Sequence, residues 1–358
     1  MGTDTVAPEF TPPASLRVLG AMMDAYLRVF VAGSAASVLS RSNPVRRTGF
    51  ELDLVVEQVR IEAEDVVSLT FEASDGGPLP AWKPGSHLDV LLPSGRQRQY
   101  SLCGNPSDRF RYRIAVRRIA DGGGGSREVH DALRPGDAVR VRGPRNAFTF
   151  IDAPSYFFVA GGIGITPILP MVKAADAAGA RWKMVYLGRS RATMPFLDEL
   201  ARLRGGELDI RPDSEFGIPD VAELITRAQA GAAVYVCGPP PVLAAAQRTM
   251  FTVNPTGSLH TERFSALPVV DGKEFDVELA RTGATVRVGA EETALAAIRR
   301  ELPGAVYSCQ QGFCGTCKVA VLAGAVDHRD RTLTEGERDT HMLSCVSRAA
   351  GDRLVLDL

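Results

Sequence analysis

Three of the six cysteines in this chain lie within nine positions, and their spacing limits what the C-terminal part can fold into. Cys309, Cys314 and Cys317 follow the pattern C-x4-C-x2-C, and Cys345 comes later, in the stretch MLSCVSR. A plant-type [2Fe–2S] cluster is held by four thiolates with this spacing. We therefore predict an iron–sulfur site formed by these four residues.

Clustered cysteines have two other common uses. Disulfide scaffolds are typical of short secreted chains, whereas this chain has 358 residues and no secretory signal in its first residues, MGTDTVAPEF. Zinc sites usually combine two CxxC-like pairs, a spacing that these four cysteines do not follow. A four-cysteine zinc site is the remaining alternative. Gly312 and Gly315 favour the cluster, because glycine lets the loop amides turn toward the sulfurs. We expect a reduced, cytoplasmic setting.

The composition is that of a globular protein of two or three domains, with 45% hydrophobic and 23% charged residues. The net charge of −1 gives no general electrostatic reason to bind nucleic acid or anionic lipid. No apolar stretch of roughly 18 residues is free of charge, so we expect no transmembrane segment. Residues 1–48 form an N-terminal extension in which residues 16–39 have the apolar spacing of an amphipathic helix. This helix is expected to pack on its own protein, with docking to a membrane surface or a partner as the alternative.

Residues 49–150 are rich in short β-branched runs separated by glycine and proline turns. Alternation with a period of two indicates strands, and a series of short strands predicts an antiparallel β-barrel. The expected strands cover residues 51–60, 66–73, 87–92, 98–102, 111–118 and 138–144.

The pattern changes in residues 151–262, where apolar strands alternate with helices. This alternation predicts a parallel sheet covered on both faces, with ligands at the carboxyl ends of its strands. Strands are expected at the start of 155–172, in 182–188 and 207–212 and at the start of 233–250, with helices in 195–203 and 219–229.

Residues 263–358 form the third expected unit. A hairpin is predicted in 274–288 and a helix in 293–302; the cluster loop and a strand in 318–324 follow. The C-terminal LVLDL would close the sheet. A small β-rich unit with one helix suits a C-terminal β-grasp ferredoxin domain, so the expected fold class is multidomain, α+β and α/β.

Arg98, in the strand RQYSL, and Ser126, after four glycines, point to a phosphate site. Ser126 lies where a helix is expected to begin, and a helix N-terminus offers unpaired N–H groups and a positive dipole end. Arginine would add a charge-assisted pair. The plainer interpretations are an N-cap for Ser126 and a solvated strand residue for Arg98.

Two further turns are expected at one edge of the parallel sheet. The stretch GGIGITP, residues 161–167, connects a strand to a helix and suits a pyrophosphate, although it differs from the GxGxxG pattern. CGPP, residues 237–240, ends the last strand predicted in this unit. Each turn could instead serve only to pack a helix or to end a strand.

The order of these motifs, RxYS, GGxGxTP, CGP and C-x4-C-x2-C…C, resembles the phthalate dioxygenase reductase family, which includes vanillate O-demethylase reductases. The resemblance covers residues 49–358. It implies an FMN-binding antiparallel β-barrel, an NADH-binding parallel sheet of the ferredoxin–NADP reductase type and a [2Fe–2S] ferredoxin domain. Electrons would pass from NADH to FMN, to the cluster and then to an acceptor protein.

By this resemblance, the residues that would bind FMN are Arg98, Tyr100, Ser101, Val116, Arg117, Gly125 and Ser126, with Phe264 near the flavin. Those at the nicotinamide nucleotide would be Gly161, Gly162, Gly164, Thr166, Gly238 and Pro239. Hydride transfer would take place between Ser101 and Cys237, the two expected catalytic residues. FMN is expected rather than FAD because the resemblance implies it and the connections are short. NADH is expected rather than NADPH, although Arg189 and Arg191 could accept a 2′-phosphate.

The expected function is that of the electron-transfer reductase component of a two-component oxygenase or demethylase with a Rieske-type partner, acting as a monomer. A cytochrome P450 or a di-iron hydroxylase or desaturase is the alternative acceptor. A zinc-binding structural protein with a degenerate nucleotide fold is the alternative from a different class.

Overall fold

The computed structural model describes residues 50–120, 124–307 and 309–358. The chain divides into two compact units, Met1–Thr48 and Gly49–Leu358, and the fold below is that of the second. The amphipathic helix predicted in residues 16–39 lies outside the described residues. Within the described ranges, no helix has the length and apolar character needed to cross a membrane.

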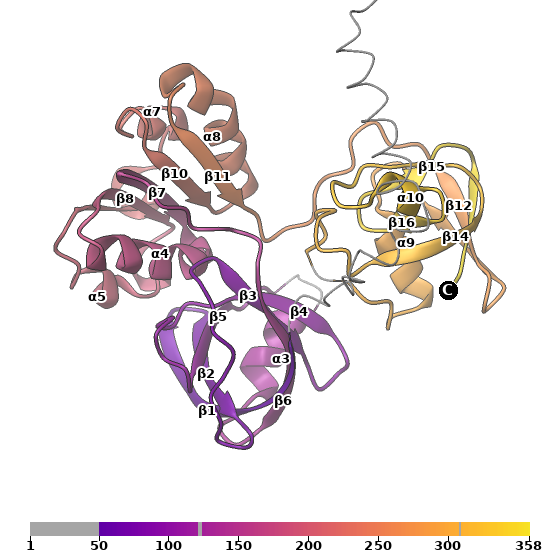
Figure 1. Ribbon diagram of the computed structural model, residues 1–358, viewed down its shortest axis with the longest axis horizontal. Helices are drawn as coiled ribbons and strands as arrows, with labels where there is room; N and C mark the ends of the chain where they lie inside the picture. The colour runs from indigo at the N-terminus through magenta and orange to yellow at the C-terminus, as the bar shows by residue number, and fades with distance from the viewer. Residues whose placement is uncertain (1–49, 121–123, 308) are drawn as a thin grey trace, which may run out of the picture. The chain divides into compact units, whose positions relative to one another are not determined.

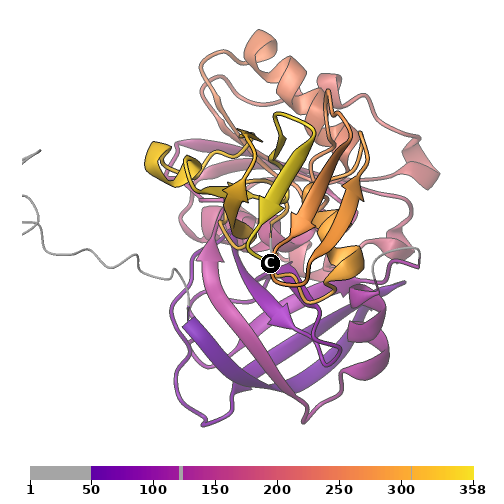
Figure 2. The ribbon, with the colours of Figure 1, turned by 90° about the vertical axis from the view of Figure 1, so that its right-hand side faces the viewer.

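The first sheet is antiparallel and curves into a barrel (Figures 1 and 2). Leu102 and Ile114 form an isolated antiparallel bridge that joins the two edge strands, so the barrel closes there. The helix α3 (Gly125–Ala132) adds Val129 to the barrel core. The strands are β1 (Phe50–Ala63), β2 (Val66–Ala73), β3 (Ser86–Leu91), β4 (Gln97–Ser101), β5 (Tyr112–Arg117) and β6 (Ala138–Asn146), in the order β4-β3-β6-β1-β2-β5. The predicted barrel is confirmed.

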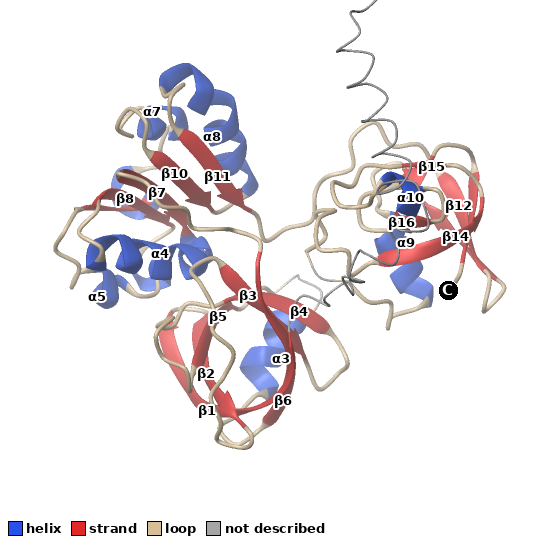
Figure 3. Ribbon diagram, viewed as in Figure 1, coloured by secondary structure: helices blue, strands red, loops and turns tan. Residues whose placement is uncertain are grey.

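The second sheet is parallel and lies between two layers of helices (Figure 3). Its strands are β7 (Ser155–Gly161), β8 (Arg181–Gly188), β9 (Glu207–Pro212), β10 (Ala233–Cys237) and β11 (Ser258–Glu262). All seven residues of β7 are buried, as expected for a strand covered on both faces. Phe158 packs toward α4 (Ile165–Ala177), whereas Phe157 packs with α7 (Val221–Ile225) and α8 (Pro240–Val253).

The strand order β11-β10-β7-β8-β9 reverses between β7 and β10. The carboxyl ends of these two neighbours carry the glycine turn and the CGPP turn, so both predicted motifs lie at a topological switch point. Two predicted helices are shorter than expected, since α5 covers only Leu197–Leu200 and α7 only Val221–Ile225. The helix α5 starts late because Phe196 has φ of +65°, outside the right-handed helical region.

The third sheet is mixed and has the hairpin, helix and strands expected of a β-grasp domain. Its strands are β12 (Phe275–Leu279), β13 (Ala284–Val288), β14 (Lys318–Ala323), β16 (His341–Leu343) and β18 (Arg353–Leu356), in the order β13-β12-β18-β14-β16. The helix α9 (Ala294–Glu301) packs Ala294, Ala297 and Ile298 into the core of this sheet. The C-terminal strand β18 is central, parallel to β12 and antiparallel to β14.

Candidate active site and cluster loop

The four predicted cluster cysteines come together as two pairs of free thiols. A hydrogen bond between Cys309 and Cys314 raises the pKa of Cys309 and lowers the pKa of Cys314 to about 5. A second hydrogen bond joins Cys317 and Cys345 and lowers the pKa of Cys317 while it raises that of Cys345. In the described ranges, no three His, Cys, Asp or Glu side chains surround a single ion position. Two pairs of thiols fit a [2Fe–2S] cluster, in which each iron takes two cysteines.

The backbone of the cluster loop depends on its glycines. Gly312 and Gly315 have φ of +77° and +73°, a region that residues with a Cβ rarely adopt. A Cβ on Gly312 would also lie 2.8 Å from Val346 Cγ2. Both glycines therefore adopt the kind of backbone angles for which the sequence analysis expects glycine in this loop.

Backbone and hydroxyl groups of the same loop lie against the thiols. The amide of Gln311 donates to Cys309 Sγ at 3.3 Å, and Thr316 Oγ1 lies 3.4 Å from Cys314 Sγ. Hydrogen bonds to ligand sulfurs adjust the reduction potential of a cluster. These two groups are positioned for that role.

Arg98 lies against the first turn of α3, where the sequence predicts a phosphate. A Cβ on Gly125 would lie only 2.5 Å from Arg98 Nε, so this approach requires glycine. Gly124 is the N-cap with φ of +79°, and the guanidinium carbon of Arg96 lies 3.7 Å from its Cβ position. Two arginines beside the unpaired amides of a helix N-terminus fit a phosphate group.

The other predicted flavin residues have different surroundings. Ser126 is not the N-cap of α3: its Oγ accepts a hydrogen bond from the Ile119 amide at 3.1 Å. Val116 packs in the barrel core, and Tyr100 is half-buried, with its pKa raised by burial. Arg117 lines the pocket described below, where the sequence predicts the nucleotide.

Ser101, at the end of β4, and Cys237, at the end of β10, are brought to one buried carboxyl group, that of Glu262. Burial raises the pKa of Glu262 to about 8, although a hydrogen bond with Ser101 works in the opposite direction. Burial, and then the Glu262 charge, raises the pKa of Cys237 well above its usual value. Glu262 Oε2 has no hydrogen-bond partner in the described structure.

A pocket of about 610 Å³ opens at the carboxyl ends of β7 and β10. Its lining includes five residues predicted for the nucleotide, namely Gly161, Gly162, Gly164, Gly238 and Pro239. It also includes Arg117 and Phe264, which the sequence predicts for the flavin. Thr166 is not among the lining residues; its hydroxyl donates to Ile163 O at 3.0 Å and so braces the glycine turn. The volume and the apolar lining of this pocket suit the nicotinamide end of a dinucleotide.

The glycines of this turn also serve close packing. A Cβ on Gly164 would lie 2.3 Å from Cys237 O, and a Cβ on Gly161 would lie 2.7 Å from Pro239 Cδ. The glycine turn and the CGPP turn therefore pack backbone against backbone. Gly162, with φ of +54°, is the position where the chain turns away.

Glu262 is a site residue that sequence reasoning missed. It ends β11, a short strand of half-buried residues without the alternation that marks a strand. Its register places it opposite Cys237, and only the sheet topology reveals that neighbour. Tyr307 was missed as well: its hydroxyl accepts a hydrogen bond from Arg98, whose guanidinium lies 5.7 Å from the ring centroid.

Two family models match the chain. The model for an oxidoreductase FAD-binding domain matches residues 53–150, and the model for a 2Fe-2S iron-sulfur cluster binding domain matches residues 277–350. The first covers the barrel and the second covers most of the third sheet and the cluster loop.

The alignments with curated relatives cover nearly the whole length of each relative. The reductase subunit of a tert-butanol monooxygenase / tert-amyl alcohol desaturase from Aquincola tertiaricarbonis is 37% identical over 326 residues, covering 86% of this chain and 96% of that protein. The phthalate dioxygenase reductase of Burkholderia cepacia is 37% identical over 304 residues, covering 83% of this chain and 94% of that protein.

Two solved structures have similar folds. An intact type IV self-sufficient cytochrome P450 monooxygenase has a TM-score of 0.66 at 40% identity, over 90% of this chain and 44% of that one. This chain therefore spans less than half of that P450 chain. The structure of phthalate dioxygenase reductase has a TM-score of 0.65 at 36% identity, over 86% of this chain and 98% of that one. With this identity over nearly complete relatives, the chain is an oxidoreductase of the phthalate dioxygenase reductase family, which passes electrons from a pyridine nucleotide through a flavin to a [2Fe–2S] cluster.

Proposed function

We propose that this chain is the NADH-dependent reductase component of a two-component oxygenase with a Rieske-type terminal partner. The observation that carries the proposal is the junction at Glu262, where the barrel contributes Ser101 and the parallel sheet contributes Cys237. A nucleotide pocket opens beside these residues. The names of several relatives, which are reductases or reductase subunits of oxygenase systems, support the choice of acceptor.

The residues of the junction have separate roles in this proposal. Nicotinamide supplies a hydride, the cluster takes single electrons, and a bound flavin connects the two because it can do both. Ser101 holds the edge of the flavin site and keeps Glu262 hydrogen bonded. Cys237 is fully buried and stays a neutral thiol, so it excludes water without adding charge beside the hydride.

FMN is the proposed flavin. Arg98 and the first turn of α3 provide a place for its single terminal phosphate. The connections around this helix are short, as the sequence indicates. The family model is named for FAD, so identification of the released flavin by chromatography tests this choice.

NADH is the proposed donor. Arg191, one of the arginines considered for a 2′-phosphate, is held by Glu215 through two hydrogen bonds of 2.8 and 3.1 Å. Asp213 lines the pocket together with Arg189. A carboxylate there can bind a ribose hydroxyl and would repel a second phosphate. In Asp213→Ser, we expect the ratio of kcat/KM for NADH to that for NADPH to fall by about tenfold.

We also propose that residues 49–150, 151–262 and 263–358 act as three modules that bind flavin, nucleotide and cluster. The extents of the two family matches support these boundaries. The protein is proposed to act as a cytoplasmic monomer without a nucleic-acid partner, since a thiol-ligated cluster suits a reducing compartment and the net charge is −1.

An anaerobic titration of the purified protein tests the electron route. We expect the flavin and iron–sulfur absorbance bands to bleach with NADH and much less with NADPH. A protein that stays colourless after reconstitution with flavin, iron and sulfide would contradict the redox function and leave the zinc alternative.

A cytochrome P450 is the second candidate acceptor. The 40% identity to the self-sufficient P450 chain favours it, although that likeness covers 44% of that chain. Reduced protein mixed with a purified Rieske oxygenase and with a purified P450 would separate the two. If the P450 oxidised the cluster faster than the Rieske oxygenase did, the P450 would replace the Rieske oxygenase as the proposed acceptor.

A further inference from the structure

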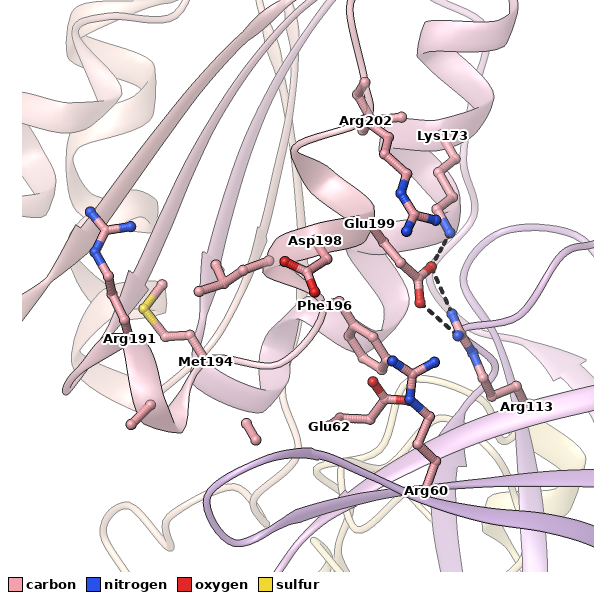
Figure 4. Close-up of a pocket in the computed structure, with 14 residues that line it drawn as sticks. Arg60, Glu62, Arg113, Lys173, Arg191, Met194, Phe196, Asp198, Glu199 and Arg202 are labelled. Carbon is pink, nitrogen blue, oxygen red and sulfur yellow. Dashed lines mark hydrogen bonds and ion pairs between the residues drawn. The ribbon is translucent and has the colours of Figure 1, made fainter.

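A second cavity, of about 660 Å³, lies between the barrel and the parallel sheet and has a charged lining (Figure 4). Arg113 comes from the barrel strand β5, Lys173 from α4 and Glu199 from α5. Figure 4 shows both cations pointing toward the Glu199 carboxylate. We call these three side chains the Glu199 junction.

The contacts within the Glu199 junction are direct. Arg113 spans the carboxylate, with Nη1 2.7 Å from Oε1 and Nη2 3.1 Å from Oε2. Lys173 Nζ donates to Oε2 of the same group. The Arg113 guanidinium also lies 4.9 Å from the ring centroid of Phe196, which precedes α5. A planar guanidinium that binds both oxygens fixes orientation as well as distance.

The Glu199 junction joins the two halves of the hydride-transfer site. Arg113 lies on the strand that carries Arg117 at its end, and its Nη2 donates to Cys103 O at 2.8 Å, two residues after Ser101. Lys173 lies on α4, which begins directly after the Gly162–Gly164 turn. One carboxylate therefore connects the flavin strands to the helix that starts at the nucleotide turn.

The Glu199 carboxylate stays ionised across the working pH range. Burial would raise the pKa of Glu199, but the hydrogen bonds from Arg113 and Lys173 outweigh it and hold the pKa at about 2. The side chains of Arg113 and Glu199 are only 20% and 22% exposed, so solvent and salt screen this pair less than a surface pair. The Glu199 carboxylate therefore remains charged and does not act as a pH switch.

We propose that the Glu199 junction positions the nucleotide-binding sheet against the flavin barrel, so that nicotinamide and flavin meet at hydride-transfer distance. This inference rests on the proposed electron route. Reacting atoms must come within about 3–3.5 Å, and a displacement of about 1 Å can lower a rate about 100-fold. Glu199 does not line the nucleotide pocket, so it is a positioning residue.

The test is anaerobic stopped-flow reduction of the holoprotein by NADH. For Glu199→Gln, we expect the limiting rate of flavin bleaching to fall by about tenfold or more. The NADH dissociation constant should stay within about twofold of wild type, because the pocket itself is intact. Glu199→Asp, which keeps the charge, should recover part of the rate.

Glu57→Gln is the matched control. Glu57 also binds an arginine through two nitrogens, with Arg111 Nη2 2.6 Å and Nε 2.7 Å from its oxygens, but both residues belong to the barrel. This variant should keep the wild-type limiting rate. Equal limiting rates for Glu199→Gln and Glu57→Gln would overturn the inference, as would a loss in Glu199→Gln confined to NADH affinity. A wild-type protein that NADH does not reduce would instead overturn the proposed function.

A second variant covers the case in which Glu199→Gln does not retain flavin and cluster. Arg113→Lys keeps the positive charge but cannot span both carboxylate oxygens. The same fall in limiting rate, with unchanged NADH affinity, supports the inference. An unchanged limiting rate in Arg113→Lys would refute it.

Discussion

The cluster loop and the proposed hydride-transfer site at Glu262 are built in opposite ways. The loop takes three of its four thiols from nine consecutive positions, and two glycines with positive φ set its backbone. The Glu262 site takes Ser101 from β4, Cys237 from β10 and Glu262 itself from β11. A local site depends on the chemistry of each ligand, whereas an assembled site depends on how sheets are held together.

This difference predicts different responses to substitution. One lost thiol removes a ligand that nothing else can replace. One lost contact at the Glu262 site changes a charge or a distance and leaves the other groups of that site in place. We therefore expect complete loss of function when a single ligand cysteine of the loop is replaced, and graded losses from substitutions at the Glu262 site.

The largest effect is expected for Cys345→Ser. A serine hydroxyl is a poor substitute for the thiolate that completes the Cys317 pair, so the cluster should be lost. Iron and sulfide analysis should show less than about a tenth of the wild-type content, because four thiolates are required. NADH should still bleach the flavin, whereas single-electron reduction of cytochrome c should disappear.

Cys103→Ser is the control for this comparison. Cys103 is fully buried, and its Sγ lies 3.5 Å from Arg113 O, a contact that a hydroxyl can also make. This variant should keep the iron content and the cytochrome c activity. A wild-type iron–sulfur spectrum in Cys345→Ser would show that the loop does not depend on each of its ligands.

Glu262 gives the largest graded effect, seen as a pH dependence of stability. Its pKa is raised from 4.5 to about 8 by burial, so the folded state holds a proton that the unfolded state releases above its own lower pKa. The contribution is fully present below about pH 4.5 and is lost as the pH rises through about 8. We expect the free energy of unfolding to fall by up to about 5 kcal/mol over this range.

Denaturant unfolding of the holoprotein at a series of pH values measures this slope. Glu262→Gln is neutral at every pH and should remove most of the slope between pH 5 and pH 9. Asp152→Asn changes an exposed carboxylate and should leave the slope in place. If the slope of Glu262→Gln matched that of wild type, the buried carboxyl would not be its source.

The same contrast explains which features the sequence predicts. The thiol spacing, the RQYS strand and the two turns depend on neighbouring residues, and the structure has each where its local pattern places it. Glu262 could not be recognised, because β11 lacks alternation and its partner Cys237 is reached only through strand order. Arg113 and Glu199 are separated by 86 positions, and their ion pair has no local signature.

Arg98→Gln should have a smaller effect, on flavin affinity. It removes the guanidinium that lies beside the first turn of α3 and leaves a shorter, uncharged polar side chain. Loss of a charge-assisted hydrogen bond costs about 1.5–3 kcal/mol, so we expect the FMN dissociation constant to rise about 10- to 100-fold. Quenching of flavin fluorescence on binding measures this constant.

Arg111→Gln is the control for this variant, since it removes an arginine of the same barrel that is paired with Glu57. The FMN dissociation constant of this variant should match that of wild type. An equal rise in both variants would mean that general loss of positive charge, and not the place of Arg98, weakens binding.

Gly125→Ala should give the smallest effect and separates position from charge at the same site. The new Cβ would lie 2.5 Å from Arg98 Nε, so the arginine must move away while it keeps its charge. We expect flavin affinity to fall by about fivefold, or about 1 kcal/mol, which is less than for Arg98→Gln. Gly351→Ala is the control, because its Cβ would meet nothing within 4 Å. Equal flavin affinities for the two alanine variants would show that Arg98 acts through its charge alone. A difference would show that the proposed phosphate site, like the Glu262 site, depends on where its groups are held.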